Sequence, residues 1–225
     1  AGSPGLERMQ GPGGNFIGFS FWPPSPLQPH YDARPLQEQL KHWSLPPRLL
    51  QNRSFLSVGS LGGFGELCYW AEENQARRVA CVDSFPPSTA GFDVFRFMHC
   101  LRRSYVEAHR VSLYDLSPQL LGGVFDVVHA VGAPDRFRHP LLALEALASV
   151  TEQLLVLDVL TLHGGHPQRA YCEYAPLGSQ HAGSATTGAE AAAVWACDMQ
   201  ALTSMLKARG FERVAEVRRE PRGAG

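Results

Sequence analysis

Short apolar runs alternate along the chain with segments whose apolar residues recur at helical spacing. The runs lie at 55–58, 79–82, 111–113, 124–131 and 154–157, and few polar residues interrupt them. Strands of this kind are buried on both faces, which requires helices on both sides of a parallel sheet. The pattern therefore predicts an α/β fold built on a mostly parallel sheet.

Helical periodicity and capping residues mark the segments between these runs. Apolar residues recur three or four positions apart in 92–101 and in 140–147, which predicts two helices that each turn one face to the sheet. Asp198 is a good N-cap for a last helix, and Gly210 is suited to end it. The residues 211–217 then predict a final strand.

The composition changes along the chain and divides it into segments. Residues 1–14 are rich in Gly and Pro, which predicts a disordered tail, and the aromatic, proline-rich segment 15–47 is expected to form an N-terminal extension or cap. Residues 48–217 are enough to bury a full core as one domain, and 218–225 follow as a tail. Within the domain, 178–190 have no periodicity, which is typical of a lid or of a disordered loop, and their place before the last helix favours a substrate lid.

The turn after the first apolar run is rich in glycine. Its glycines fall at 59, 62, 63 and 65, and Asp83 closes the next apolar run. Glycines let a ligand approach the backbone closely and leave amide hydrogens free to donate to it. A carboxylate at the end of the neighbouring strand accepts hydrogen bonds from the hydroxyls of a ribose. The unit predicts a nucleotide site, and its spacing differs from the G-x-G-x-x-G of dinucleotide sites, which favours S-adenosylmethionine.

Charge, hydropathy and cysteine content bear on partners and surroundings. The net charge of −1 gives no electrostatic reason to expect a nucleic-acid partner. No apolar stretch approaches the ~18 residues that a membrane helix needs. The five cysteines are an odd number, and several lie in apolar runs, where free cysteine behaves as a small hydrophobe. These features favour a cytoplasmic protein in a reducing setting.

In their order and spacing, these segments resemble class I S-adenosylmethionine-dependent methyltransferases. The matching stretches are Leu-Ser-Val-Gly-Ser-Leu-Gly-Gly-Phe at 56–64, Val-Asp-Ser-Phe at 82–85, Leu-Tyr-Asp-Leu at 113–116, Gly-Val-Phe-Asp-Val-Val at 123–128 and Arg-His-Pro-Leu-Leu-Ala-Leu at 138–144. The branch of closest resemblance contains the wobble-uridine tRNA methyltransferases and related small-molecule methyltransferases. The resemblance implies a Rossmann-like fold with a central, mostly parallel seven-stranded sheet, helices on both faces and an antiparallel last strand.

The resemblance also implies where the cofactor, S-adenosyl-L-methionine, and its product, S-adenosyl-L-homocysteine, bind. Asp83 matches the acid that binds the ribose. Asp115 matches the acid that accepts the adenine amino group, the alternatives being a solvated turn carboxylate or a helix cap. The implied cofactor-binding residues are Gly59, Ser60, Gly62, Gly63, Asp83, Ser84, Asp115, Leu116, Ala130 and Val131.

The chain departs from the family pattern at the turn and after the fourth strand. Ser57 stands where relatives usually have an acid, and Leu61 replaces the second glycine of the turn. A charge-assisted hydrogen bond is worth about 1.5–3 kcal/mol, so its loss weakens cofactor binding without excluding it. Asp135 and Arg136 replace a tyrosine-histidine pair. Because its pKa exceeds ~12, an arginine cannot act as a general base at neutral pH.

Histidines are the candidate bases for methyl transfer. His163 follows the fifth strand and is expected to face the cleft above the sheet, and His129 is the second candidate. His139 precedes a proline at a helix start, which favours a structural role. Asp158, His163 and His166 resemble a facial metal triad, but their spacing across a Gly-Gly turn is not diagnostic, and we expect no metal.

The acceptor is expected to contact aromatic and basic residues. Tyr31 and Trp195 are candidate aromatic walls, with core packing as the alternative. Arg136 has the charge and forked donors to hold an anionic group, whereas an ion pair with Asp135 is the competing interpretation. The favoured function is methyl transfer to oxygen or nitrogen of a small molecule, such as a specialised metabolite. The alternatives are a tRNA-modifying methyltransferase and a relative without catalysis.

Overall fold

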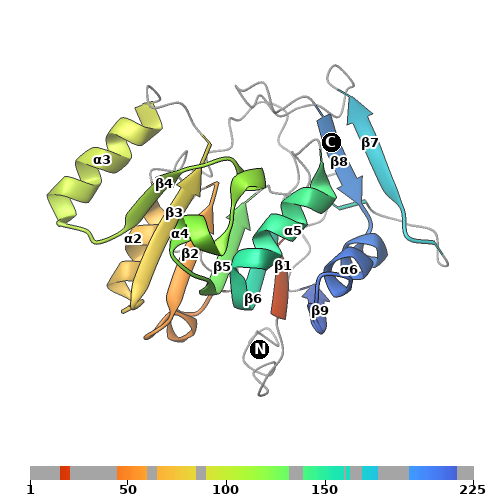
Figure 1. The fold of residues 1–225 in the computed structure, drawn as a ribbon, viewed down its shortest axis with the longest axis horizontal. Helices are drawn as coiled ribbons and strands as arrows, with labels where there is room; N and C mark the ends of the chain where they lie inside the picture. Colours follow the sequence, from red (N-terminus) through yellow and green to blue (C-terminus); the bar gives the residue numbers. More distant parts are fainter. Residues whose placement is uncertain are drawn as a thin grey trace, which may run out of the picture.

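A parallel sheet between two layers of helices forms the body of the molecule, and a two-stranded hairpin lies beside it (Figure 1). The computed structural model describes residues 16–20, 45–59, 65–84, 90–131, 139–159, 161–162, 169–176 and 193–216. The α/β architecture predicted from the alternating apolar runs is confirmed.

The sheet has seven strands in the described part of the chain. Their spatial order is β4 (Glu107–Arg110), β3 (Arg78–Asp83), β2 (Ser54–Val58), β5 (Phe125–Val131), β6 (Thr151–Asp158), β1 (Phe16–Ser20) and β9 (Arg213–Glu216). Every neighbouring pair runs parallel. The carboxyl ends of all these strands therefore meet at one edge, where ligands of open α/β sheets bind.

Helices connect the strands, and a hairpin precedes the last helix. The helices are α2 (Glu66–Glu73), α3 (Ala90–Arg102), α4 (Pro118–Leu121), α5 (Pro140–Val150) and α6 (Met199–Lys207), with short 3-10 turns η2 (Pro47–Leu49) and η4 (Leu113–Asp115). The hairpin consists of β7 (Cys172–Pro176) and β8 (Ala193–Cys197), which pair antiparallel.

The prediction of an antiparallel last strand is wrong, because β9 runs parallel to its neighbour. Phe16 of β1 pairs with both Leu154 of β6 and Arg213 of β9. The strand β1 thus lies between β6 and β9, although it comes from the segment expected to form a cap. The pairing of β9 with β1 spans nearly the whole chain, so no local sequence pattern reveals the direction of β9.

The expected strand at 111–113 is also wrong. The strand ends earlier, at Arg110, and its residues alternate between half-buried and exposed, as an edge strand does. Leu113 begins the 3-10 turn η4 instead, and its preceding Ser112 accepts a hydrogen bond from Tyr114 N at 3.4 Å. The apolar residues Val111 and Leu113 suggest a strand, but only Leu113 is buried, and it is buried as part of the 3-10 turn.

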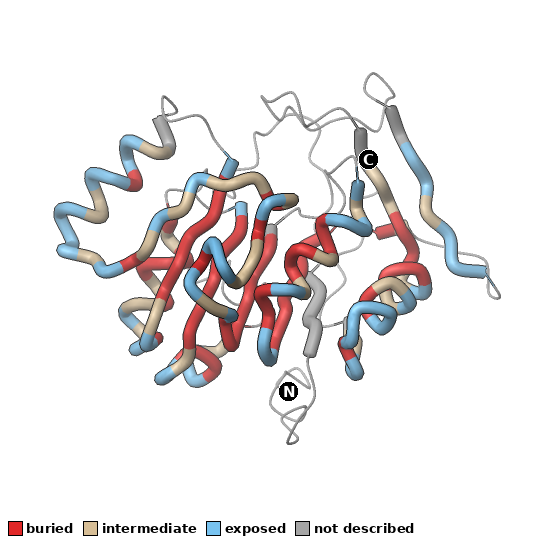
Figure 2. Tube along the Cα trace, in the orientation of Figure 1, coloured by how far each residue is buried: buried red, intermediate tan, exposed pale blue. Residues whose placement is uncertain are grey.

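Alternate residues of the strands build two cores on opposite faces of the sheet. Leu56 and Val128 pack toward α5 and α6, whereas Phe55 and Val127 pack toward α2. Figure 2 shows the central strands buried along most of their length. The two-sided burial that the apolar runs predicted is confirmed.

The helical periodicity is confirmed at most positions of the predicted helices. In α3, Phe95 is 2% exposed, but Leu101 of the same predicted face is 67% exposed. The carboxylate of Asp198 accepts a hydrogen bond from Ala201 N at 2.7 Å and caps α6 as predicted. Gly210 has φ +92° three residues after the helix ends at Lys207.

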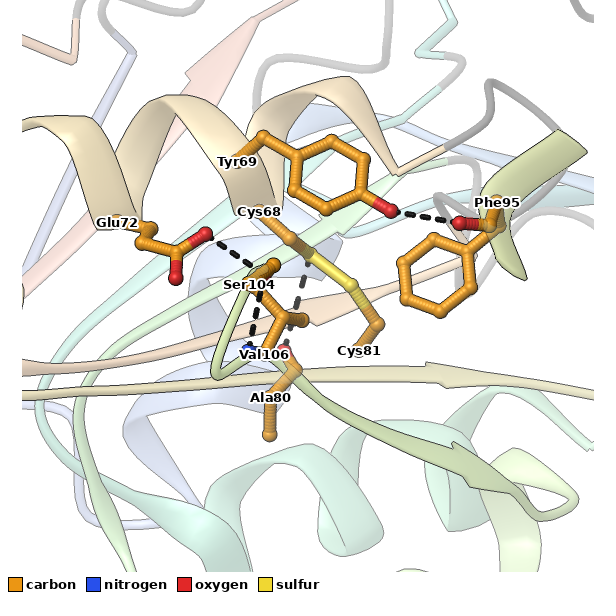
Figure 3. Close-up of a disulfide and its surroundings, with 8 residues drawn as sticks. All are labelled: Cys68, Tyr69, Glu72, Ala80, Cys81, Phe95, Ser104 and Val106. Carbon is orange, nitrogen blue, oxygen red and sulfur yellow. Dashed lines mark hydrogen bonds between the residues drawn. A yellow bond between two sulfur atoms is a disulfide. The ribbon is translucent and has the colours of Figure 1, made fainter. Parts of the chain in front are cut away.

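Four of the five cysteines are paired, which corrects the expectation of free thiols in the apolar runs. Cys68 of α2 and Cys81 of β3 form one disulfide, drawn in Figure 3, and Cys172 and Cys197 join the two strands of the hairpin. Cys100 is free and exposed. The first pairing follows from the fold because Cys81 lies on the face of β3 that packs against α2, and the second because Cys172 and Cys197 lie directly opposite each other in the hairpin. The reducing, cytoplasmic setting stays a prediction.

A hydrogen bond and a ring contact join α2 to α3. The hydroxyl of Tyr69 donates to the carbonyl of Phe95 at 2.8 Å, and their rings stack with centroids 5.6 Å apart (Figure 3). Burial raises the pKa of Tyr69 to about 12, against the opposing charge of Arg102. The hydroxyl therefore keeps its proton, and this hydrogen bond, across the pH range in which proteins are usually studied.

In the described part of the chain, no helix is both long and apolar enough to span a membrane.

Candidate functional site

The predicted nucleotide-binding unit lies at the carboxyl edge of the sheet. Gly59 follows β2 with φ +78°, a left-handed conformation that favours glycine. Its amide donates to the carbonyl of Val82 at 2.9 Å, which holds the start of the turn against β3. A side chain at Gly59 would strain the backbone where the chain leaves the sheet, so the glycine is explained by local geometry.

Asp83 is the last residue of β3 and stands beside this turn. It is 7% exposed, and it pairs in register with Arg110 of β4. Ser84 follows directly and is exposed. A carboxylate fixed at the end of a strand, next to a glycine turn, is in the position where nucleotide-binding sheets hold a ribose.

Asp115 lies at the same edge, after β4. It is exposed at the end of η4, while its neighbour Leu116 is buried in the core. The caps of the two nearest helical turns are Ser112 and Ser117, so neither of these caps uses Asp115. Its placement leaves the carboxylate accessible to a ligand or to solvent.

Ala130 and Val131 end β5, which lies between β2 and β6. Ala130 pairs with Val58, and Val131 pairs with Asp158. Neighbouring strands are about 4.8 Å apart, so the end of β5 lies about 10 Å from Asp83 across the sheet. The structure thus brings together four of the predicted cofactor-binding segments: the ends of β2, β3 and β5 and the turn after β4.

His129 and Ser57 form a buried polar pair of neighbours just below this edge. They are register partners on β5 and β2, and both are 0% exposed. Their face of the sheet is the one that packs against α2, because Val127 and Val156 on the same face belong to that core. The structure therefore gives His129 the surroundings of a buried core residue on the α2 side of the sheet.

Ser57 is the more unusual of the two. Its Oγ is buried and has no hydrogen-bond partner in the described structure. Leaving a buried polar group unpaired costs about 1–3 kcal/mol. A ligand atom that reaches this hydroxyl would remove that cost, and Ser57 occupies the position where the resemblance places an acidic residue. The donor set at the edge therefore fits a nucleoside-type cofactor.

Several predicted residues cannot be placed. The turn residues, the first candidate base His163, most of the acceptor contacts and the lid lie outside the described residues: Ser60, Leu61, Gly62, Gly63, Tyr31, Asp135, Arg136, His163, His166 and 178–190. Their roles stay predictions. The residues that the structure describes contain no group of three metal-ligating side chains.

The sequence pattern did not predict the two strands of the β7–β8 hairpin. The hairpin places Trp195 directly opposite Tyr174, with ring centroids 4.9 Å apart. Trp195 Nε1 is buried and donates no hydrogen bond in the described structure. The signal that points to the hairpin is the apolar run at 193–197, which contains a β-branched and an aromatic residue, as strands often do.

Comparison with known proteins gives matches in structure only. No protein-family model matches the sequence, and no curated protein matches it either. Among solved structures, the N-terminal domain of EvdMO1 with SAH bound superposes with a TM-score of 0.56 at 17% identity, covering 76% of this chain and 73% of that one. An S-adenosylmethionine-dependent methyltransferase from Mesorhizobium loti gives 0.56 at 16% identity, with coverages of 80% and 82%.

A third match extends the range of activities on this fold. The [4+2]-cyclase SpnF superposes with a TM-score of 0.53 at 15% identity, covering 81% of this chain and 61% of that one. Identities this low carry the fold and not the activity. The sheet order, the two helical layers and these superpositions together show that the chain has the Rossmann-like fold of class I S-adenosylmethionine-dependent methyltransferases.

Proposed function

We propose that this protein is an S-adenosylmethionine-dependent methyltransferase that acts on oxygen or nitrogen of a small molecule. The observation that carries the proposal is the buried carboxylate of Asp83, fixed at the end of β3 beside the left-handed Gly59. The solved structures on the same fold include a domain with SAH bound, which supports the choice of cofactor.

Each segment of the edge has a role in holding the cofactor. Asp83 would accept hydrogen bonds from the ribose hydroxyls, the backbone at Gly59 would hold the methionine part, and Asp115 would accept a hydrogen bond from the adenine amino group. Ala130 and Val131 form the floor on which cofactor and acceptor meet. When bound, S-adenosylmethionine supplies an electrophilic methyl group, so the chain's own task is to align an acceptor with that methyl and to exclude water.

The near-neutral charge supports a small acceptor over tRNA. Proteins that bind nucleic acid neutralise several phosphates, and this chain has 20 basic against 21 acidic residues. The likeness to the wobble-uridine branch remains a prediction from sequence. Arg136, which lies outside the described residues, stays our candidate for orienting an anionic acceptor.

Calorimetry with the cofactor product tests the proposal. We expect S-adenosylhomocysteine to bind the wild-type protein, and Asp83→Ala to weaken binding by about 1.5–3 kcal/mol, because a buried hydrogen bond to a charged group is lost. Asp83→Asn, which keeps the shape, should give a smaller loss in the same direction. The matched control is Asp93→Ala, an exposed aspartate on α3 that should leave the affinity unchanged.

Thermal unfolding gives an independent check on the class of cofactor. A ligand that binds only the native state stabilises it by mass action. S-adenosylhomocysteine should raise the Tm, and NAD should not. Equal stabilisation by NAD would reverse the assignment, and binding of S-adenosylhomocysteine without any turnover would favour the non-catalytic alternative.

A further inference from the structure

The inner face of the β7–β8 hairpin carries an aromatic pair. In this antiparallel hairpin Cys172 lies opposite Cys197, and Tyr174 lies opposite Trp195. Opposed residues and alternate residues of a strand share one face. The disulfide and the aromatic pair are therefore on the same side of the hairpin, whereas Tyr171 belongs to the other side by alternation.

The disulfide end of that face is part of the domain core. Cys197 is 5% exposed and belongs to the same apolar cluster as Val159, which follows β6. Thr161 forms a parallel bridge with Cys197, and Leu162 N donates to Cys197 O at 3.1 Å. The segment that leaves β6 thus runs along β8, so the inner face of the hairpin is anchored beside the carboxyl end of β6.

The aromatic pair lies two residues beyond this anchor, toward the far end of the hairpin. Figure 1 shows the hairpin next to α6, with that end on the side where the parallel strands end. The rings of Tyr174 and Trp195 are inclined at 54°, and Tyr174 is 49% exposed. The aromatic pair thus remains partly exposed, while the disulfide end of the same face is buried in the core. An exposed aromatic surface that is held in place in this way is suited to contact another flat ring. The unpaired Nε1 of Trp195 adds a hydrogen-bond donor.

The order of strands places this surface on the acceptor side of the proposed site. From β3 through β2 and β5 to β6, the edge presents Asp83, Gly59, Val131 and then the anchor of the hairpin. If the ribose lies at β3 and the methionine part at β2, the acceptor lies farther along, over β5 and β6. The sheet continues beyond β6 with β1 and β9, and the segment that leaves the carboxyl end of β6 bridges to Cys197, which brings the hairpin to that end of β6.

We propose that the β7–β8 hairpin is the acceptor-binding wall, and that Tyr174 and Trp195 contact a planar, unsaturated ring that bears an oxygen. The oxygen accepts a hydrogen bond from Trp195 Nε1. This inference rests on the proposed methyltransferase function and adds to it the class of acceptor.

Binding of two matched probes to the protein saturated with S-adenosylhomocysteine tests it. One probe is 3,4-dihydroxybenzoate, a planar ring with oxygens, and the other is quinate, a saturated hydroxylated ring with a carboxylate. We expect the protein to bind 3,4-dihydroxybenzoate more tightly than quinate in NMR titrations. Tyr174→Leu and Trp195→Leu should each raise its Kd about 3- to 10-fold, the range expected for loss of one aromatic contact.

Two further variants distinguish the loss of a contact with the probe from a general effect on the structure of the hairpin. Tyr171→Leu removes a tyrosine that is 53% exposed on the opposite side of the hairpin, and it should leave the Kd for 3,4-dihydroxybenzoate unchanged. Trp195→Phe keeps a ring but removes the donor, so its Kd should lie between those of wild type and Trp195→Leu. Unchanged affinity for S-adenosylhomocysteine in all variants shows that each one is folded.

The outcomes distinguish this inference from the function on which it rests. If the wild-type protein fails to bind S-adenosylhomocysteine, the proposed function falls and the inference with it. If that ligand binds but Tyr174→Leu and Trp195→Leu leave the probe affinity unchanged, only the inference is overturned. Equal binding of both probes, binding of neither, or an equal loss in Tyr171→Leu also overturns it.

Discussion

Gly65 shows how one residue joins the candidate site to the packing of the helices. It precedes α2 with φ +72°, where it is the N-cap of that helix. A Cβ built at this position would come within 2.6 Å of the Phe95 ring on α3. The position therefore requires glycine for two independent reasons, the left-handed backbone and the close approach of α3.

Replacing Gly65 by alanine should destabilise the protein by about 2–4 kcal/mol, since backbone strain and overpacking add. Gly210→Ala is the matched control, because its φ is +92° but nothing lies within 4 Å of the added carbon. We expect a loss of about 1 kcal/mol there, from strain alone. Urea unfolding measures both. Equal losses in the two variants would show that the contact with Phe95 contributes nothing.

Several residues of the site could be predicted because their signal is local. The glycine at 59 and the acid at 83 follow apolar runs, and the structure places both at strand ends. The disulfide partners Cys68 and Cys81 could not be predicted, because their approach depends on how α2 crosses the sheet. The burial of His129 follows from its register with Ser57, which a single sequence does not reveal.

At the scale of elements, Asp198 connects the hairpin to the last helix. One carboxylate oxygen accepts from Ala201 N at 2.7 Å in the first turn of α6, and the other accepts from Tyr171 N at 3.1 Å just before β7. The backbone amide of Asp198 also donates to Tyr171 O at 2.9 Å. The same residue thus caps α6 and fixes the start of the hairpin.

Asp198→Ala should lower the free energy of unfolding by about 1–2 kcal/mol, the usual cost of a lost N-cap. Asp198→Asn keeps an oxygen that can accept from Ala201 N but has no second acceptor for Tyr171 N, so it should keep the cap and lose less stability than Asp198→Ala. Thermal unfolding followed by circular dichroism measures the difference. A loss in the asparagine variant as large as in the alanine variant would show that the cap is not the source of the effect.

The elements that the sequence pattern predicted best are those with a strong period and a nearby cap. The helix α5 begins at Pro140 as expected, and β6 contains the whole apolar run at 154–157. The sequence pattern predicted neither β1 as a strand of the main sheet nor the β7–β8 hairpin. Their strands are short, and the partners of β1 lie more than a hundred residues away, so only the assembled fold defines them.

For the whole molecule, the amino edge of the sheet provides a fixed base opposite the candidate site. Asp126 at the start of β5 accepts hydrogen bonds from Ser54 N and Ser54 Oγ, both at 2.7 Å, and from Gln153 Nε2 at 2.8 Å. Arg77 adds an ion pair at 3.0 Å. The starts of β2, β3, β5 and β6 are thereby joined through one carboxylate, while their far ends remain available to a ligand.

This carboxylate predicts how stability depends on pH. Burial alone would raise the pKa of Asp126, but the Ser54 hydrogen bonds and the charge of Arg77 outweigh it and hold the pKa below its usual value of 3.8. Because the folded-state pKa is lowered, the stabilisation is present above the ordinary aspartate pKa and is lost as pH falls through the folded-state value. Asp126→Asn should cost about 2–3 kcal/mol at neutral pH.

Urea unfolding at about pH 7 and about pH 3 measures that dependence. Between these values the unfolded-state carboxylate with its ordinary pKa takes up a proton before the folded one, so the stability advantage of wild type over Asp126→Asn narrows. The exposed Asp93→Asn serves as the control and should differ little from wild type at either pH. A gap between wild type and Asp126→Asn that stays constant with pH would contradict the account.

The position of β1 between β6 and β9 bears on the order in which the molecule is made. A chain leaves the ribosome from its N-terminus, so β1 is synthesised long before either of its neighbours, which begin at Thr151 and Arg213. Until β6 has been made, the hydrogen-bonding groups of β1 have no neighbouring strand in the sheet, and an unpaired strand is open to wrong pairing. The strand β1 is thus placed in the sheet only after more than a hundred further residues have been made, so the growing chain carries it without its sheet neighbours while β2 to β5 are synthesised.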